Sequence, residues 1–363
     1  MKLMGLLLAL TMIAAACGDS DESGDTTAAP EETTATTEAG PTSDTNVGLT
    51  FDIGGRGDQS FNDSAATGID KAQNELGISF TEAEPNADGS NRSELLQTQA
   101  DVSQLVIAVG FLFGGDVEAV AAENAGVNFA VIDDAMLDFD NGGVPRGDNI
   151  AGLTFAEHEG SFLVGVAAAL KSETGTVGFI GGVSGFGLIE RFEAGFNEGA
   201  RAVNPDIEII PQYITEFPNF DGFNAPDRAK DIALGMYDQG ADIVYHAAGG
   251  SGAGMFEAAK EQSEATGSKV WGIGVDSDQY NTVSTSVQEY VMTSMLKRVD
   301  VAVFEITKAH EDGMFAAGNT VYDLSVDGVG YSTTGGFIDD IVDQIEDYKA
   351  KIVSGEIVVP TEP

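Results

Sequence analysis

The sequence predicts an α/β protein made of two doubly wound lobes, each a parallel sheet with helices on both faces, and a ligand cleft between them. Three observations favour this fold class. Short apolar runs alternate with longer amphipathic runs from about Val47, the alternation starts again after residue 153, and 363 residues exceed one ordinary core. Because parallel strands bring their carboxyl ends to one edge of a sheet, ligands are expected at that edge.

The first lobe is predicted from a βαβαβ series. Each strand is a short apolar run, each helix is amphipathic, and Gly77 is placed to end the first helix as a C-terminal cap. Strands are expected at residues 46–53, 78–84, 105–111 and 127–134, and helices at 64–77, 92–103 and 116–126. Such an alternation gives parallel strands connected by helices.

The second lobe is predicted because the same alternation resumes after a loop-like segment at residues 141–152, which is expected near a crossover between the lobes. Helices are expected at 154–172, 187–204, 225–240 and 252–267, and strands at 176–182, 207–214, 241–250 and 269–276. A strand at 290–297, a hairpin at 321–332 and a helix at 337–355 are expected to follow. We assign residues 47–153 and about 279–320 to lobe 1, and about 154–278 and 321–363 to lobe 2.

The N-terminal residues predict export and membrane attachment. An apolar run at 3–13 is too short to span a bilayer, and small residues lead from it to Cys17, the only cysteine. Since LTMIAAAC resembles a lipobox, residues 1–16 are expected to be a lipoprotein signal peptide and Cys17 the lipid attachment site. Acyl chains bind a membrane through buried methylenes, at about 0.8 kcal/mol each. The alternative is that Cys17 is a small residue within a discarded signal.

Residues 17–46 are expected to form a lipidated, acidic, flexible tether. They are rich in Ser, Thr, Glu, Asp and Gly and almost free of large apolar side chains. Such a segment cannot offset its own ordering entropy, and its negative charge extends it. Its expected function is therefore spacing.

The charge of the chain excludes several partners. Its 59 acidic and 17 basic residues give a net charge of −42. Nucleic acid and anionic lipid both require a basic surface, so neither is expected to bind. Acidity spread along the chain suggests exposure to salty water, in which ions screen the self-repulsion.

The sequence shows no pattern typical of a metal site or of the common hydrolases. His158, His246 and His310 are scattered without metal-ligand spacing. A Gly-x-Ser-x-Gly elbow and a Gly-x4-Gly-Lys-Ser/Thr loop do not occur. We expect no metal, no cofactor and no catalysed reaction. His246 follows a predicted strand near the cleft, and we interpret it as a packed strand residue, with ligand contact as the alternative.

Candidate site residues collect where predicted strands end. One aspartate after a strand is most often a helix cap or a turn residue. Here acidic, aromatic and glycine residues follow several strands at the carboxyl edge, which favours ligand contacts instead. These residues are Asp52, Phe111, Phe113, Asp133, Asp134, Gly249, Gly250 and Asp276.

Five motifs occur in one order along the chain: DIGGRGDQSFNDSA, GFIGGVSGFGLIERFEAGFNEG, AAGGSGAGMFEAA, GVDSDQ and TSMLKRVD. Together they resemble the basic membrane protein family, the substrate-binding lipoproteins of ABC importers whose characterised type is the purine nucleoside receptor. The resemblance covers about residues 47–360. It implies a two-lobed type I periplasmic-binding fold and, as partners, a nucleoside, an ABC permease and its ATPase.

The resemblance implies a group of residues that contacts the base. The family motif DKSFN appears here from Asp58 to Asn62, with Gln59 in place of the common lysine. Phe61 is then expected to stack on the base and Asn62 to hydrogen-bond its edge. Asp133 or Asp134 matches the family carboxylate that accepts from a base N–H, which favours a purine.

The resemblance also implies a group that binds ribose. Asp52 and Asp276 resemble residues that grip ribose hydroxyls. Gly249 or Gly250 would approach the sugar through backbone amides. Lys297, in TSMLKRVD, resembles a pocket lysine that reaches a ribose oxygen or pairs with Asp276.

The second stacking aromatic is placed by the segment GFNAPDRAK, which best matches the family phrase SFNDPAKGK and nominates Phe223. An apparent insertion, EFPNFD, leaves Phe217 and Phe220 as alternatives. Ala225 stands where the family often has aspartate.

Physical chemistry supports a nucleoside in such a cleft. Aromatic walls favour planar rings over sugars, and carboxylates accept charge-assisted hydrogen bonds from vicinal hydroxyls. A missing hydroxyl would leave a buried carboxylate unsatisfied, which distinguishes ribose from deoxyribose. The lobes are expected to close over the ligand about a hinge, and a monomer suits docking on a permease.

The alternative function is a binding protein or sensor for another small ligand, either a different nucleoside or a sugar-like signal. A nucleoside-processing enzyme is disfavoured. A nucleoside hydrolase needs a calcium-holding aspartate cluster near its N-terminus, and Asp133 with Asp134 does not form one by itself.

Overall fold

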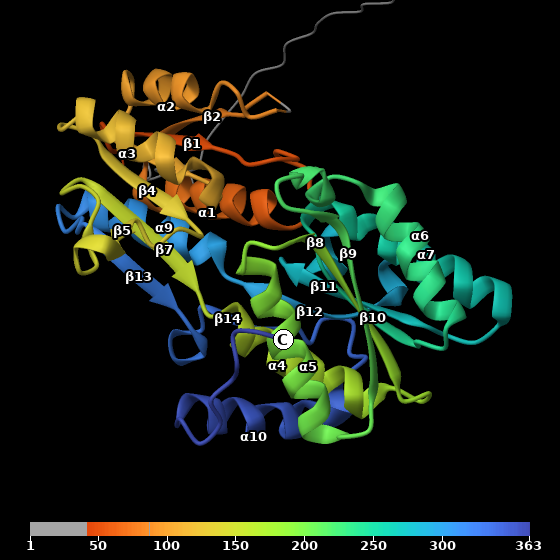
Figure 1. Ribbon diagram of the computed structural model, residues 1–363. Helices are drawn as coiled ribbons and strands as arrows, with labels where there is room; N and C mark the ends of the chain where they lie inside the picture. The colour runs from red at the N-terminus through yellow and green to blue at the C-terminus, as the bar shows by residue number, and fades with distance from the viewer. Residues whose placement is uncertain (1–41, 87) are drawn as a thin grey trace, which may run out of the picture. The chain divides into compact units, whose positions relative to one another are not determined.

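The computed structural model describes residues 42–86 and 88–363. The predicted signal peptide, Cys17 and the predicted tether up to residue 41 lie outside the described residues. In the described part, one six-stranded sheet has the order β2-β1-β3-β4-β7-β13 and is parallel throughout (Figure 1). Its strands are β1 (Asn46–Thr50), β2 (Ser79–Ala83), β3 (Leu105–Ala108), β4 (Asn128–Ile132), β7 (Ile150–Phe155) and β13 (Gly318–Tyr322).

A second six-stranded sheet repeats this arrangement with the order β9-β8-β10-β11-β12-β14, in which only β14 is antiparallel. Its strands are β8 (Thr176–Ser184), β9 (Glu208–Glu216), β10 (Ile243–Ala247), β11 (Trp271–Asp276), β12 (Val291–Lys297) and β14 (Val329–Tyr331). In both sheets the second strand of the lobe lies at one edge and the later strands follow on the other side of the first. The predicted fold class, two doubly wound α/β lobes, is therefore confirmed.

Helices cover the first sheet in two pairs, α1 (Phe61–Leu76) with α9 (Val299–Glu311), and α2 (Arg92–Ala100) with α3 (Gly114–Glu123). Figure 1 shows α9 and β13, which come late in the chain, among the early elements of this lobe. Gly77 ends α1 with φ +74°, a left-handed conformation that glycine adopts at little cost, as the sequence predicts.

Helices of the second lobe also form pairs, α4 (Glu157–Lys171) with α5 (Leu188–Val203), and α6 (Pro226–Asp238) with α7 (Gly252–Thr266). The helix α10 (Val342–Val353) packs on α4. Two glycines of α5 permit the close approach of α4, because a Cβ atom at Gly195 or Gly199 would lie 2.0 Å from a carbonyl oxygen of that helix. Close packing of this kind holds α4 rigidly, and α4 begins at the junction between the lobes.

The chain crosses between the lobes three times: between β7 and α4, between β12 and α9, and between β13 and β14. Backbone hydrogen bonds join the crossing segments. Ala156 N–H donates to Tyr322 O at 3.0 Å, and Arg298 N–H donates to Gly328 O at 2.9 Å. Three adjacent, mutually bonded connections form a hinge.

The structure corrects three details of the sequence prediction. The predicted loop at 141–152 and the predicted helix from residue 154 both overlap β7, because this strand completes the parallel pairing between β4 and β13. The segment 290–297 belongs to the second sheet, where β12 pairs with β11, so the return to lobe 1 comes after Lys297 and not at about residue 279. Residues 321–332 are not a hairpin, because β13 and β14 join different sheets.

Candidate ligand-binding site

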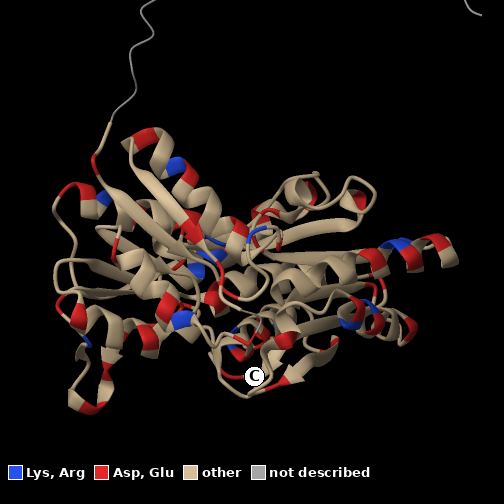
Figure 2. Cartoon of the chain, turned by 90° about the horizontal axis from the view of Figure 1, so that it is seen from above, with Lys and Arg blue, Asp and Glu red and all other residues tan. Residues whose placement is uncertain are grey.

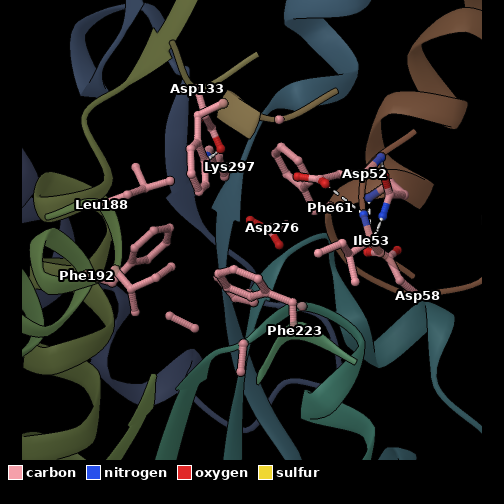
Figure 3. A pocket seen from close by; sticks show the side chains of 18 residues that line it. Asp52, Ile53, Asp58, Phe61, Asp133, Leu188, Phe192, Phe223, Asp276 and Lys297 are labelled. Atoms are coloured by element: carbon pink, nitrogen blue, oxygen red, sulfur yellow. Dashed lines mark hydrogen bonds and ion pairs between the residues drawn. The ribbon is translucent and has the colours of Figure 1, made fainter. Parts of the chain in front are cut away.

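A cavity lies between the lobes at the carboxyl ends of the strands, and both lobes line it (Figure 3). The first lobe contributes acids and two phenylalanine rings, and the second lobe contributes mainly apolar side chains. The lining residues of the first lobe are Asp52, Ile53, Asp58, Phe61, Asn62, Gly110, Phe111 and Asp133. Those of the second lobe are Leu188, Ile189, Phe192, Phe223, Ala247, Ala248, Gly249, Val275, Asp276 and Lys297.

The loop before α1 is shaped by two side chains that bond to backbone. The carboxylate of Asp58 accepts from the N–H groups of Ser60, Asn62 and Asp63, at 2.9, 2.8 and 3.1 Å, and so caps the helix. The amide of Asn62 accepts from Asp52 N–H at 2.9 Å and donates to Ile53 O and to Asp58. Asn62 also lines the cavity, and its amide holds the loop that carries Asp52.

Asp133 and Asp276 occupy equivalent places, at the carboxyl ends of the fourth strand of each sheet in chain order. Both have left-handed backbone conformations, with φ +69° and +64°. Such conformations cost a non-glycine residue free energy, and they concentrate at functional sites. Asp276 Oδ2 accepts from Ser60 Oγ of the first lobe at 2.5 Å, so this carboxylate already contacts both lobes.

Lys297 is 2% exposed and lies within a group of acids and rings. Its Nζ is 2.7 Å from Asp133 Oδ2 and 3.3 Å from Glu157 Oε1. The rings of Phe61, Phe155 and Phe192 have their centroids 5.1, 5.1 and 5.6 Å from this ammonium, which is within cation–π range. The Lys297–Asp133 pair joins β12 of the second lobe to the end of β4 in the first.

The pKa values of the cavity acids reflect burial. Burial raises the pKa of Asp276 to about 7, against the charge of Lys297 and the bond from Ser60. Burial also raises the pKa of Asp52 to about 6, against the bond from Ile53 N–H and the charge of Arg92. Burial opposes the charged form of Lys297, but the acids Asp133, Glu157 and Asp276 outweigh it and raise the pKa of this lysine.

Buried acids of this kind gain from hydrogen-bond donors. Asp133 Oδ1 is buried and has no hydrogen-bond partner among the described residues. A buried acceptor without a donor costs about 1–3 kcal/mol, and a ligand hydroxyl or N–H would remove that cost. The site is therefore suited to a neutral ligand that carries several donors.

Phe223 is the one of the three candidate aromatics that lines the cavity. The hydroxyl of Ser251 holds its segment, because it accepts from Ala225 N–H at 2.7 Å and donates to Gly222 O at 2.7 Å. Figure 3 shows the rings of Phe61 and Phe223 separated by the Asp276 carboxylate.

Phe217 and Phe220 belong to an aromatic cluster beside Phe223. Phe217 is 56% exposed, and Phe220 lies between it and Phe223, with ring centroids 5.9 and 6.5 Å away. Phe111 of the first lobe stacks on Phe186 of the second at 4.9 Å and contacts Phe220 at 5.8 Å. The cluster thus reaches from the cavity wall across to the other lobe.

The structure gathers most of the predicted site residues in this one cavity and separates the alternatives. Asp133 lines the cavity, whereas Asp134 does not and instead accepts from Met136 N–H at 2.8 Å in a turn. Gly249 lines it and Gly250 does not. His246 is fully buried behind the lining and donates to or accepts from Gln279 at 2.8 Å.

Several residues of the site were missed by the sequence prediction. The first turns of α5 contribute Leu188, Ile189 and Phe192 to the cavity. The spacing of these apolar residues predicts a helix but does not show that they face a ligand. Glu157 is 1% exposed, at the start of α4, and its contact with Lys297 depends on the crossover that joins the lobes. Asp58 belongs to the motif DIGGRGDQSFNDSA and Gln279 to the motif GVDSDQ. A sequence motif does not show which atoms its side chains contact.

The described residues hold neither a cluster of metal ligands nor a helix able to span a membrane. Residues 42–86 and 88–363 hold no group of three or more His, Cys, Asp or Glu side chains that could bind a metal ion. In the same part of the chain, no helix is both long and apolar enough to cross a membrane.

Comparison with known proteins agrees with this geometry. The family described as Bmp, ABC transporter substrate-binding protein PnrA-like, matches residues 45–362. The CD4+ T-cell-stimulating antigen of Listeria innocua is 34% identical, over all of both chains. The ABC transporter nucleoside-binding protein BmpA of Lactococcus lactis is 31% identical, over 98% of this chain and 97% of that one.

Solved structures give the same result. An ABC transporter solute-binding protein of Aeropyrum pernix superposes with a TM-score of 0.73 at 29% identity, over 87% of this chain and 94% of that one. A solute-binding protein of Conexibacter woesei superposes with a TM-score of 0.69 at 20% identity, over 87% and 99%, and supports the fold. These matches, together with the cleft between two doubly wound lobes, show that the chain belongs to the Bmp family of ABC transporter substrate-binding proteins.

Proposed function

We propose that the protein binds nucleosides, with purine nucleosides preferred, in the cavity between the lobes, and presents them to an ABC permease driven by its ATPase. One observation carries the proposal: Phe61 of one lobe and Phe223 of the other line the same cavity as the acids Asp52, Asp133 and Asp276. Rings bind the faces of a planar base, and acids bind the donors of the base edge and the ribose. The name of the Lactococcus relative supports the same ligand class.

Each group has an expected role. Phe61 and Phe223 stack on the base, and the free Oδ1 of Asp133 accepts from a base N–H. Asp52 and Asp276 accept from ribose hydroxyls, and Lys297 orients Asp133 and reaches the ligand from the hinge side. Because Asn62 is bonded to Asp52 N–H, Ile53 O and Asp58, we assign it to shaping the loop as well as to the cavity wall.

Isothermal titration calorimetry with adenosine, guanosine, inosine, uridine and ribose tests the ligand class. Stacking of a base on aromatic side chains contributes about 1–3 kcal/mol per base, so ribose should bind at least about 10-fold more weakly than the best purine nucleoside. Native mass spectrometry of the purified protein would identify any ligand that copurifies. Equal binding of ribose and inosine, or no binding of any nucleoside, contradicts the proposal.

A sugar-like ligand is the alternative, and the acids of the cavity favour it as much as they favour ribose. The aromatic walls decide between the two. Phe223→Leu keeps an apolar wall and removes the ring face, so it should weaken binding of a nucleoside and leave binding of a sugar nearly unchanged. The same titrations with this variant distinguish the two ligand classes.

We further propose that the mature protein is an extracytoplasmic monomer anchored through lipid on Cys17. The support is the lipobox-like LTMIAAAC and the acidic segment that follows it. Mass spectrometry of the protein extracted from membranes should show an acylated Cys17 as the first residue. A mature chain that begins elsewhere and lacks lipid contradicts the anchoring.

A further inference from the structure

Gln279, at the start of the short helix α8 (Gln279–Thr282), is 1% exposed and connects four segments. Its Oε1 accepts from Val275 N–H at 3.0 Å and lies 2.8 Å from His246 Nε2. Its Nε2 donates to Gln59 O of the first lobe at 3.0 Å, and its own N–H donates to Ser294 Oγ at 3.1 Å. One side chain thus bonds to β10, β11 and the other lobe.

The backbone partners fix which way the amide points. The N–H group of Val275 can only donate and the carbonyl oxygen of Gln59 can only accept, so Oε1 must face the Val275 N–H and Nε2 must face Gln59 O. His246 Nε2 then faces an acceptor oxygen and must carry the proton. Its Nδ1 has no partner among the described residues, which agrees with a neutral ring protonated on Nε2 alone.

Burial supports the neutral form of this histidine. It lowers the pKa of His246 to about 4, against the hydrogen bond to Gln279. The ring packs so closely that a Cβ atom at Gly252 would lie 1.9 Å from it. The imidazole can therefore neither turn nor exchange its bonded nitrogen, and it holds the amide of Gln279 in one orientation.

The side-chain amide of Gln279 bonds both to the strand end that carries Asp276 and to the first lobe. Val275 immediately precedes Asp276, whose left-handed conformation directs its carboxylate into the cavity. Gln59 has φ +59°, and its carbonyl oxygen also accepts from Thr282 Oγ1 at 3.2 Å. Gln59 and Ser60 of the first lobe come directly before Phe61 in the chain.

We propose that Gln279 is a positioning residue for ligand binding, whose amide fixes the strand end that presents Asp276 and joins it to the Gln59 carbonyl of the first lobe. When the lobes close, the same amide then orients the Asp276 carboxylate toward the ligand. This inference rests on the proposed function, since it names the residue that couples closure to that site.

Gln279→Glu is the sharpest variant, because it keeps the shape and the acceptor for Val275 N–H but replaces the donor to Gln59 O by a negative oxygen. The dissociation rate of the best nucleoside should rise at least 10-fold, measured by stopped-flow fluorescence, with a smaller change in association rate. Gln239→Glu is the matched control, since Gln239 is exposed and its side-chain amide donates to Gly235 O of α6, the helix that it follows. Its rates should equal those of the native protein.

Thr282→Val provides a milder variant that does not disturb the buried amide. Thr282 is exposed, and its hydroxyl donates to the same Gln59 carbonyl. Dissociation should be about twofold to fourfold faster, and the melting temperature should stay close to native. Unchanged dissociation in both Gln279→Glu and Thr282→Val would overturn the inference, even if nucleosides bind the native protein.

A ligand-independent measurement separates this inference from the proposed function. Nitrogen NMR of histidine-labelled protein should show His246 neutral with its proton on Nε2, and in Gln279→Glu the introduced carboxylate should favour the doubly protonated ring. A proton on Nδ1 in the native protein would show that the amide is oriented the other way and would overturn the inference. Absence of nucleoside binding with the expected tautomer would instead reject the proposed function.

Discussion

Among the contacts that join the lobes at the cavity, a polar contact and an aromatic contact differ in chemistry. The polar contact joins Gln59 and Ser60 of the first lobe to side chains of the second lobe, which are those of Asp276, Ser277 and Gln279. Ser277 Oγ, for example, donates to Ser60 O at 2.9 Å. The aromatic contact places Phe111 on Phe186 and Phe220. The polar contact includes buried groups and an acid of the cavity, whereas the three rings of the aromatic contact are only partly buried.

This difference in chemistry gives the two contacts different roles in closure of the lobes. Hydrogen bonds weaken steeply when donor and acceptor move apart or tilt, so the polar contact defines one relative position of the lobes. Ring contacts tolerate small shifts, and the aromatic contact therefore favours closure without fixing its geometry. The polar contact should thus control both the fit of the ligand and the lifetime of the closed cleft, whereas the aromatic contact should affect that lifetime alone.

The largest expected effect is at Asp276, which belongs to both the polar contact and the cavity. Asp276→Ala removes a ligand acceptor and the partner of Ser60 Oγ. Nucleoside affinity should fall at least tenfold, about 1.4 kcal/mol or more, by calorimetry. Asp206→Ala, at an exposed aspartate of the same lobe, is the control and should bind as the native protein does. Native affinity in Asp276→Ala would remove this residue from the site.

The next effect is a dependence of stability on pH to which Asp276 of the polar contact contributes. The pKa of Asp276 is raised to about 7 in the folded protein from an ordinary value of 3.8, so between these values the folded state binds more protons than the unfolded state. Its contribution to stability is fully present below the lower value and is lost as the pH rises through about 7. The slope is at most about 1.4 kcal/mol per pH unit for one such group.

Urea unfolding at pH 5, 6 and 7 measures this slope. Asp52, whose pKa is raised to about 6, acts in the same direction and leaves a residual slope. Asp276→Asn should therefore flatten the fall in unfolding free energy with pH without abolishing it, while Phe111→Ala keeps the native slope. An Asp276→Asn variant as pH-dependent as the native protein would show that this acid is not held partly protonated by burial.

The sequence predicts which residues belong to the site better than it predicts the contacts between their side chains. The strand ends carrying Asp52, Asp133 and Asp276 could be located, because apolar runs mark strands and parallel strands end at one edge. The choice between Asp133 and Asp134 could not, since both follow the same strand and only the backbone turn decides which faces the cavity. Resemblance to the family favours Phe223 over Phe217 and Phe220, and Phe223 is the one of these three that lines the cavity.

The features that could not be predicted depend on long-range pairing. The strand β7 could not be predicted because Gly152 and the glycines before it in the sequence are typical of a loop. The strand forms because it pairs with β4 and β13 in the sheet. The apparent hairpin at 321–332 has the local pattern of paired strands, but its two halves pair with strands far away in the sequence. Glu157 becomes part of the site only because the hinge brings it beside Lys297.

The aromatic contact should give a moderate effect. Phe111→Ala removes two ring pairs, and such pairs contribute about 0.5–1.5 kcal/mol each beyond burial. We expect about fivefold faster dissociation of every ligand that binds, measured by stopped-flow fluorescence, with little change in the ratio of affinities between nucleosides. Phe139→Ala is the control, because this phenylalanine of the first lobe is 73% exposed. A change in ligand preference would mean that Phe111 contacts the ligand directly.

The smallest effect is expected at the edge of the polar contact. Ser277→Ala removes one neutral hydrogen bond to Ser60 O, and a bond of this kind contributes about 0.5–1.5 kcal/mol net. Because Ser277 is only partly buried, water can replace the lost donor, so affinity should fall only about threefold by calorimetry. Ser354→Ala, at an exposed serine that bonds within its own turn, should match the native protein. If Ser277→Ala costs more affinity than Phe111→Ala, single hydrogen bonds of the polar contact, rather than the rings, are the main force that holds the lobes together.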